Sequence, residues 1–227
     1  MKHQSAVRLS TYLITLFITS IAFGQSAART PEQIALLKFY PAAQGIAFAV
    51  GASPVNLVFD GDSIWVGNAH SRSLTKLRAS DGALLGTFPT QDVAAPVVFD
   101  GANIWLLNPN FNSVTKVRAS DGTRLATFPV GLHPFGMAFD GTNIWVANFE
   151  ASTVTKLNAS TGAVVGTFPT GRGPRGMAFD GANIWVTNGA DNTVTKLRAS
   201  DGAHLGTFAT GLDPVKVVFD GLSLIHI

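Results

Sequence analysis

Residues 174–188 read PRGMAFDGANIWVTN, and the core of this stretch returns along the chain at a fixed interval. Its Phe-Asp-Gly triplet begins at five positions that are 40 residues apart every time: Phe59, Phe99, Phe139, Phe179 and Phe219. Its Ile-Trp pair begins at Ile64, Ile104, Ile144 and Ile184. Self-similarity at a period of 20 to 50 residues is typical of repeat architectures. The sequence therefore predicts four complete repeats, at 59–98, 99–138, 139–178 and 179–218.

Each repeat is expected to hold four short strands. In the third repeat these are Gly136–Phe139, Asn143–Ala147, Thr153–Leu157 and Ala163–Phe168, with a tight turn at Asp140-Gly141. Most strands are apolar on both alternating faces, so they must lie between two layers. Blades that pack between neighbouring blades supply both layers. We therefore predict an all-β chain that forms a β-propeller of four-stranded, 40-residue blades.

Composition supports this class over a helical solenoid of similar period. The chain has 46% hydrophobic residues, only 13% charged residues and 23 glycines. Glycine and β-branched residues interrupt every possible helix, and no stripe with a period of 3.6 residues is present. The balance of apolar and charged residues also excludes a disordered chain.

The repeats resemble a known family. Residues 174–188, followed by NTVTKL at 192–197 and SDG at 200–202, are similar to the YVTN and NHL type of β-propeller repeat. That broad group includes proteins of the YncE type and streptogramin (virginiamycin B) lyase. The resemblance covers residues 54–221. It implies the propeller fold, but it does not fix an activity, because this scaffold hosts binding proteins, lyases and lactonases alike.

The two ends of the propeller, which we assign to residues 44–221, are incomplete repeats. Residues 44–53 align with the fourth strand and the loop after it, with Phe48 at the position of Phe88 and Gly51 at that of Gly131. After Gly221 the repeat pattern stops, and residues 222–227 read LSLIHI. These six residues match a translation of a transposon end sequence used in sequencing libraries, so we expect an artefactual tail on an incomplete ring. The alternative is a degenerate second strand with Leu224 at the isoleucine position.

The first residues have the layout of a secretory signal peptide. Lys2 and Arg8 are followed by an apolar run of thirteen residues, from Thr11 to Phe23, and then by small residues that suit cleavage before Gln25 or Arg29. A membrane anchor is the alternative, but the run is shorter than the ~20 residues that a spanning helix needs. We predict a signal peptide at 1–28, a linker at 29–43, and a protein that is secreted or periplasmic and does not insert in the membrane after cleavage.

Charge excludes one class of partner. The chain holds 16 Lys and Arg against 14 Asp and Glu, so removing Lys2 and Arg8 leaves 14 against 14. A neutral chain lacks the basic stripe that nucleic-acid backbones require. The absence of cysteine excludes disulfides. We expect no cofactor, and the partner is a protein or a small molecule that the sequence does not identify.

Candidate binding residues are those that differ between repeats, since repeated positions are needed by the blade itself. They gather in the connections between the second and third strands and between the fourth strand and the next blade, which a propeller places on one face. Aromatic and charged residues on one face are what a binding site needs, although drift on a tolerant surface is an equal alternative. The candidates are His70, Arg72, Phe111, His133, Phe149, Glu150, Arg172, Arg175, Asp191, Asp213 and Lys216.

Signals for catalysis are poor. No His, Asp and Glu cluster has metal-ligand spacing, and the only His–acid pair on the variable face combines His70 or His133 with Glu150. The repeated lysines, Lys76 to Lys196, are expected to lie on a blade with the ammonium in water. The sequence favours a non-catalytic exported binding protein. The alternatives are a lyase or lactonase on the same scaffold and a repeat module of a larger surface protein.

Overall fold

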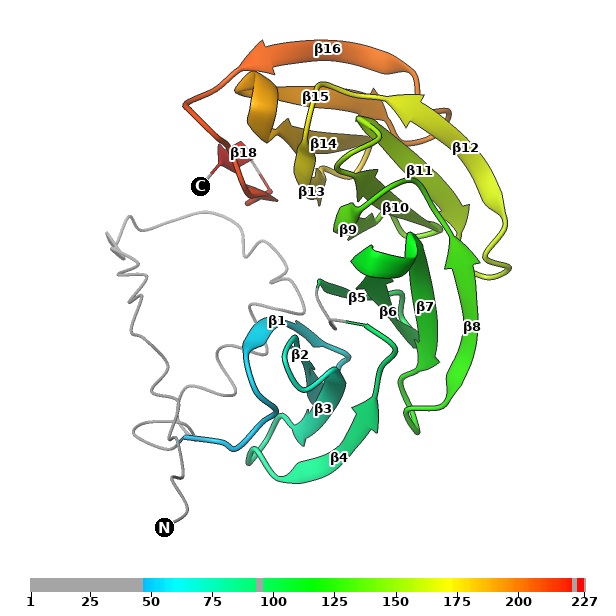
Figure 1. Cartoon of the computed structure of the whole chain (residues 1–227), viewed down its shortest axis with the longest axis vertical. Helices are drawn as coiled ribbons and strands as arrows, with labels where there is room; N and C mark the ends of the chain where they lie inside the picture. Colours follow the sequence, from blue (N-terminus) through cyan, green and yellow to red (C-terminus); the bar gives the residue numbers. More distant parts are fainter. Residues whose placement is uncertain (1–46, 93–95, 222–223, 227) are drawn as a thin grey trace, which may run out of the picture.

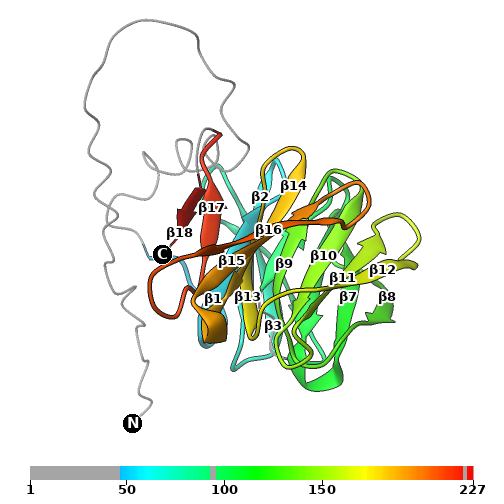
Figure 2. The same ribbon diagram turned by 90° about the horizontal axis from the view of Figure 1, so that it is seen from above.

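The computed structural model describes residues 47–92, 96–221 and 224–226. Four antiparallel sheets of four strands each follow one another along the chain, and Figure 1 shows them as an arc around a common centre. Within each sheet the strands pair in chain order, with the first strand nearest the centre of the arc and the fourth outermost (Figure 1). These are the blades of a β-propeller, as predicted. Figure 2 shows the sheets from above, standing side by side.

The four blades share nearly the same strand boundaries. Blade 1 holds β1 (Pro54–Phe59), β2 (Ser63–Asn68), β3 (Ser73–Arg78) and β4 (Leu84–Pro89). Blade 2 holds β5 (Val97–Phe99), β6 (Asn103–Asn108), β7 (Ser113–Arg118) and β8 (Arg124–Pro129). Blade 3 holds β9 (Pro134–Phe139), β10 (Asn143–Asn148), β11 (Thr153–Asn158) and β12 (Val164–Pro169). Blade 4 holds β13 (Pro174–Phe179), β14 (Asn183–Asn188), β15 (Thr193–Arg198) and β16 (His204–Ala209).

Strand positions in the third repeat were predicted to within two residues. The first strand starts at Pro134 rather than Gly136, and the fourth runs from Val164 to Pro169 rather than from Ala163 to Phe168. Two short 3₁₀ helices, η1 (Pro109–Phe111) and η2 (Gly189–Asp191), occupy the connection between the second and third strands in blades 2 and 4.

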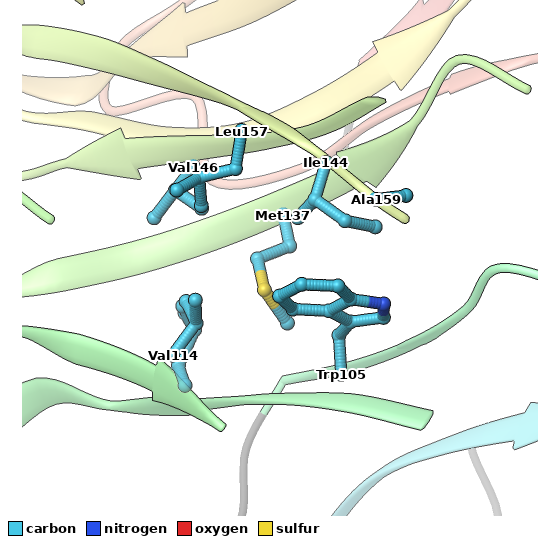
Figure 3. Close-up of a cluster of buried hydrophobic side chains, with 8 residues drawn as sticks. Trp105, Val114, Met137, Ile144, Val146, Leu157 and Ala159 are labelled. Carbon is cyan, nitrogen blue, oxygen red and sulfur yellow. The ribbon is translucent and has the colours of Figure 1, made fainter. Parts of the chain in front are cut away.

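The hydrophobic core lies between blades, in layers that repeat. Trp105 and Val114 of blade 2 face Ile144, Val146 and Leu157 of blade 3, and Figure 3 shows this layer with the thioether of Met137 against the indole. Trp65 and Trp145 lie in the corresponding layers between blades 1 and 2 and between blades 3 and 4. Trp65, Trp105 and Trp145 have no exposed surface at all. Burying such a large apolar surface between sheets is the main force that holds the blades together.

The repeated aspartates and lysines complete each blade at one edge, which we call the turn rim because it carries the Asp-Gly turns. In blade 3, Asp140 Oδ2 accepts a 2.7 Å hydrogen bond from Trp145 Nε1, while Oδ1 accepts the backbone N–H groups of Thr142 and Asn143. The same aspartate–tryptophan bond recurs in the other three blades, at 2.7–2.8 Å. The repeated Asp-Gly turns and tryptophans are therefore structural, as the sequence indicates.

The prediction that the repeated lysines keep their ammonium groups in water is wrong. Lys156 is only 4% exposed, and its Nζ donates to the backbone carbonyls of Ala199 and Ser200 in the next blade, at 2.7 and 3.0 Å. The same Nζ lies 5.0 Å from the centre of the Trp145 ring. Lys76 and Lys116 make the corresponding bonds to blades 2 and 3. Each of these three lysines thus joins two blades, because its acceptor is about one repeat further along the chain.

The two ends of the arc differ from the predicted partial strands. The described residues 47–53 contain no strand, so the fourth-strand part of the prediction is wrong where it can be compared. The loop part agrees with the structure, in which Ser53 and Ala52 accept the backbone N–H groups of Ala69 and Ser71. At the other end β17 (Val217–Phe219) pairs with β18 (Leu224–His226), with Phe219 opposite Leu224. Phe139 and Ile144 are paired in the same way in blade 3, so Leu224 takes the isoleucine position that the degenerate-strand alternative gives it. The origin of residues 222–227 stays a prediction, as do the signal peptide at 1–28 and the linker at 29–43, which lie outside the described residues.

Candidate functional site

The variable connections lie together at the edge opposite the turn rim, which we call the loop rim. Hydrogen bonds tie the connection that enters each blade to the connection between its second and third strands. Asp92 Oδ2 accepts the backbone N–H of Asn110 at 2.8 Å, and Asp191 Oδ2 accepts that of Arg172 at 2.6 Å. The two kinds of variable connection therefore share one face, as the propeller topology predicted.

The backbone of the loop rim repeats even though its side chains vary. The residue before each third strand, from Arg72 to Asn192, has a positive φ between 45° and 56°. His133 and Asp213 also have positive φ, at 48° and 49°, which is uncommon for residues other than glycine. Asn112 and Asn192 fix these residues by accepting the backbone N–H groups of His133 and Asp213, both at 2.8 Å. The loop rim is therefore a rigid frame that displays different side chains.

A cluster of variable side chains surrounds Phe149 at the junction of blades 3 and 4. The guanidinium of Arg175 lies 5.4 Å from the centre of the Phe149 ring. The rings of Phe135 and His133 lie 6.0 and 6.1 Å from it. Arg175 Nη1 donates a 2.7 Å bond to Asp213 Oδ1. We call His133, Phe135, Phe149, Glu150, Arg175 and Asp213 the Phe149 cluster.

Two polar pairs at the edge of the Phe149 cluster are partly exposed to solvent. His133 Nδ1 lies 3.8 Å from Glu150 Oε1, with side chains that are 44% and 60% exposed. The side chain of Asp213 is 64% exposed, whereas that of Arg175 is 23% exposed. The Nε atom of Arg175 is buried and has no hydrogen-bond partner. The cluster thus offers a stacking surface, an arginine with donor capacity to spare and a His–acid pair in one place.

The other candidates lie on the same rim outside this cluster. Arg172 and Asp191 form an ion pair on blade 4, with Arg172 Nε 2.7 Å from Asp191 Oδ1. The backbone N–H of Arg172, and then its side chain, lower the pKa of Asp191. The remaining candidates are exposed on the rim: His70 and Arg72 of blade 1, Phe111 of blade 2, and Lys216 just before β17.

Sequence reasoning misplaced one member of the cluster and missed another. Arg175 was expected in a connection, but it is the second residue of the inner strand β13. Phe135 holds the same place in β9 and is 44% exposed, so it belongs to the site although it was not among the candidates. The sequence carries a sign of this, because Phe135 and Arg175 are one repeat apart and one is aromatic whereas the other is charged.

The described residues show no metal site, no membrane-spanning helix and no phosphate-binding loop of the strand–loop–helix kind. They contain no group of three or more His, Asp and Glu side chains that could hold a metal ion. None of their helices is long and apolar enough to cross a bilayer. The glycine-rich stretch 171–176 leads into strand β13, and not into the helix that a phosphate-binding loop requires.

Comparison with known proteins supports the fold and leaves the family open. No family model and no curated protein sequence matches the chain. Among solved structures, it is similar to a protein of unknown function from Desulfotomaculum acetoxidans, with a TM-score of 0.69 and 18% identity over 79% of this chain and 64% of that one. It is similar to a streptogramin B lyase, with a TM-score of 0.67 and 15% identity over 78% of this chain and 62% of that one.

A third similar structure is hydrazine synthase from Kuenenia stuttgartiensis, with a TM-score of 0.66 and 18% identity over 77% of this chain and 54% of that one. The chain thus spans between about half and two thirds of the length of these structures. Identities this low show a common fold and nothing finer. The YVTN and NHL assignment therefore stays a prediction, and what the fold, the blade contacts and these comparisons establish together is that the chain forms blades of a β-propeller.

Proposed function

We propose that this chain is an exported, non-catalytic β-propeller that binds a small molecule or a protein through its loop rim, with the Phe149 cluster as the contact site. The observation that carries the proposal is the cluster itself. Six side chains outside the repeated set converge there from two blades and the connection before β17. A rigid scaffold that presents variable residues is a common way to build a binding site.

The chemistry of the cluster favours a ligand that has a flat apolar part and a negative charge. Phe135 and Phe149 offer ring surface, and aromatic and arginine side chains dominate binding hot spots. Arg175 uses Nη1 for Asp213 and has no partner for its buried Nε. Its planar fork suits a carboxylate or a phosphate. An aromatic carboxylate or an acidic peptide with an aromatic residue satisfies both requirements.

Ligand-observed NMR with benzoate, phenyl phosphate and an Asp-Phe peptide tests the proposal, with benzyl alcohol as the neutral probe. We expect the anionic probes to bind, and the triple variant His133→Ala, Phe149→Ala, Arg175→Gln to lose at least about tenfold in affinity, roughly 1.4 kcal/mol. Phe111→Ala is the matched control, since it removes an exposed aromatic from the same rim outside the cluster. Equal binding by the parent and the triple variant, or no binding of any probe, would count against the site.

A lyase or lactonase is a second candidate because the His133–Glu150 pair supplies a base and an acid on the loop rim, 3.8 Å apart. A histidine beside a carboxylate is the usual arrangement for general acid–base catalysis. Incubation with streptogramin B and with a γ-lactone, followed by mass spectrometry, separates the two reactions: elimination opens the ring without a change of mass, whereas hydrolysis adds one water. Turnover that His133→Ala abolishes would favour the enzyme, and no turnover of either substrate would leave binding as the function.

A further inference from the structure

The guanidinium of Arg175 lies against two residues that are one repeat apart, Phe149 and Gly189. Each directly follows the second strand of its blade, β10 in blade 3 and β14 in blade 4. The guanidinium lies over the Phe149 ring. A Cβ atom added at Gly189 would lie 3.1 Å from both Nε and Cζ of Arg175, so the guanidinium fills the space beside this glycine. Blade 3 therefore supplies a ring, and blade 4 supplies room, at the same position of the repeat.

Gly189 is needed for its lack of a side chain and not for its backbone conformation. It is buried at the start of η2, and its φ is not positive, so an alanine fits the backbone. The added Cβ would, however, lie only 2.9 Å from Asp213 Oδ1. Asp213 is exposed and its carboxylate ends a flexible side chain, so the Arg175–Asp213 pair would move before the fold was disturbed.

The other blades show that the repeat itself does not require a glycine here. The equivalent residues are Ala69 in blade 1, Pro109 in blade 2 and Phe149 in blade 3. All three positions follow a second strand with the same last residue, an asparagine. A glycine that served the folding of the blade would recur in every repeat. Its presence in blade 4 alone, beside Arg175, indicates that it serves the arginine.

These contacts decide which atoms of the guanidinium a ligand can reach. Nε is buried and has no partner among the described residues, so an anion does not reach it unless the side chain moves. Nη1 donates to Asp213 Oδ1 at 2.7 Å. Nη2 forms no hydrogen bond with the described residues and, unlike Nε, is not a buried atom. The Nη end of Arg175 is therefore the part that a carboxylate or a phosphate contacts.

We propose that Gly189 is a positioning residue of the Phe149 cluster. By leaving space beside Phe149 it holds the guanidinium of Arg175 with Nε buried and the Nη end open to the anionic group of the ligand. Gly189 does not contact the ligand itself. A larger residue displaces the guanidinium, and its planar fork loses the direction that binding of a carboxylate requires. The ligand part of this inference rests on the proposed function, whereas the placement of Arg175 rests on the contacts alone.

The placement can be tested without a ligand, through the rate at which the Nε–H proton of Arg175 exchanges with water. NMR measures this rate, and Arg175→Lys assigns the signal by removing it. Burial slows exchange, so we expect the rate to rise in Gly189→Ala and to rise further in Gly189→Val. The matched control is Ala69→Val, which enlarges the equivalent residue of blade 1 and should leave the rate unchanged. An unchanged rate in both Gly189 variants would overturn the proposal.

Benzoate affinity tests what the placement does for binding. We expect Gly189→Val to weaken binding about tenfold, the size expected when one hydrogen bond between charged groups is lost. In the Arg175→Lys protein the same change should have little effect, because a compact ammonium group on a flexible stem can move away from residue 189. Ala69→Val should not change the affinity.

The two measurements separate the possible failures. Equal losses of benzoate affinity from Gly189→Val in the parent and in the Arg175→Lys protein would overturn the positioning role, since the effect would then not pass through the guanidinium. Failure of the parent to bind benzoate, phenyl phosphate or the Asp-Phe peptide would refute the proposed function and the ligand part of this inference. The exchange rates would still decide whether Gly189 places Arg175.

Discussion

The two rims of the propeller are built by opposite rules. At the turn rim each blade repeats the same side chains. In blade 3 the aspartate accepts the tryptophan N–H, and the lysine lies over the tryptophan ring and donates to a backbone carbonyl of the next blade. At the loop rim the backbone repeats, with positive φ at corresponding positions, while the side chains differ from blade to blade. The comparison shows that repetition can be carried by side chains or by backbone alone. Where only the backbone repeats, the side chains are available for function.

Removal of a buried tryptophan should have the largest effect on stability. Trp145 has no exposed surface and packs between blades 3 and 4. We expect Trp145→Ala to cost about 3–5 kcal/mol of unfolding free energy, because it leaves a cavity and deprives Asp140 of a donor. Trp185→Ala should cost less, since Trp185 is only partly buried. Urea unfolding measures both, and a cost below about 1 kcal/mol for Trp145→Ala would mean that the ring does not hold the blades together.

The lysine contacts across blades should rank second. In Lys156→Met the apolar stem is retained, but the carbonyls of Ala199 and Ser200 lose their donor. An unsatisfied buried acceptor costs about 1–3 kcal/mol. Lys196→Met is the matched control, because Lys196 is only partly buried in the last complete blade. Equal costs in urea unfolding would show that the ammonium–carbonyl bonds do not contribute.

Acid should weaken the turn rim, because the pKa values of two of its aspartates are lowered. Burial raises the pKa of Asp180, but hydrogen bonds from Trp185, Asn183 and the backbone outweigh it and lower the pKa to about 2. The pKa of Asp140 is lowered by the same kinds of bonds, again against burial. Since both are depressed, the unfolded state binds more protons below its own pKa of about 3.9, and unfolding is favoured as the pH falls from there toward about 2.

Urea midpoints measured between pH 5 and pH 2 test this dependence. Asp180→Asn should be less stable than the parent at pH 5, because its amide presents a donor where Trp185 Nε1 needs an acceptor. The difference should shrink toward pH 2, as the parent's carboxylate becomes protonated. Asp62→Asn is the control, since Asp62 lies exposed on the same rim. A constant gap between Asp180→Asn and the parent across this range would contradict the assignment.

The sequence predicted the turn rim better than the loop rim, for a physical reason. The period of 40 residues predicted the blades and their strands, because strand pairing and the Asp140–Trp145 hydrogen bond lie within one repeat. The role of Lys156 was not foreseen, since its acceptor at Ala199 belongs to the next blade and depends on how blades stack.

The Phe149 cluster was only partly foreseen for a related reason. Phe149, Arg175 and Asp213 all vary between repeats, but variation alone does not show that they meet across a blade junction. Phe135 was not among the candidates, although Arg175 at the equivalent repeat position was. Phe135 and Arg175 hold the equivalent second position of β9 and β13, so variable residues of the inner strands also belong to the site.

Changes in the loop rim should have the smallest effect on stability, and this prediction decides whether the two rims really differ. Arg175→Gln removes a pair with Asp213, whose side chain is 64% exposed, and exposed ion pairs contribute about 0.2–1 kcal/mol. It also removes the stacking on Phe149, worth about 0.5–1 kcal/mol at an exposed site, and a buried Nε that has no partner to lose. We therefore expect a net cost below about 2 kcal/mol, with a coupling of about 0.5–1 kcal/mol between Arg175→Gln and Phe149→Leu in a double-mutant cycle. If Arg175→Gln instead cost more than about 2 kcal/mol, a size reserved for buried structural features, the cluster would hold blades 3 and 4 together as the lysines do. Loss of binding in its variants would then report on folding, and the search for a ligand would move to the exposed residues of blades 1 and 2, beginning with His70, Arg72 and Phe111.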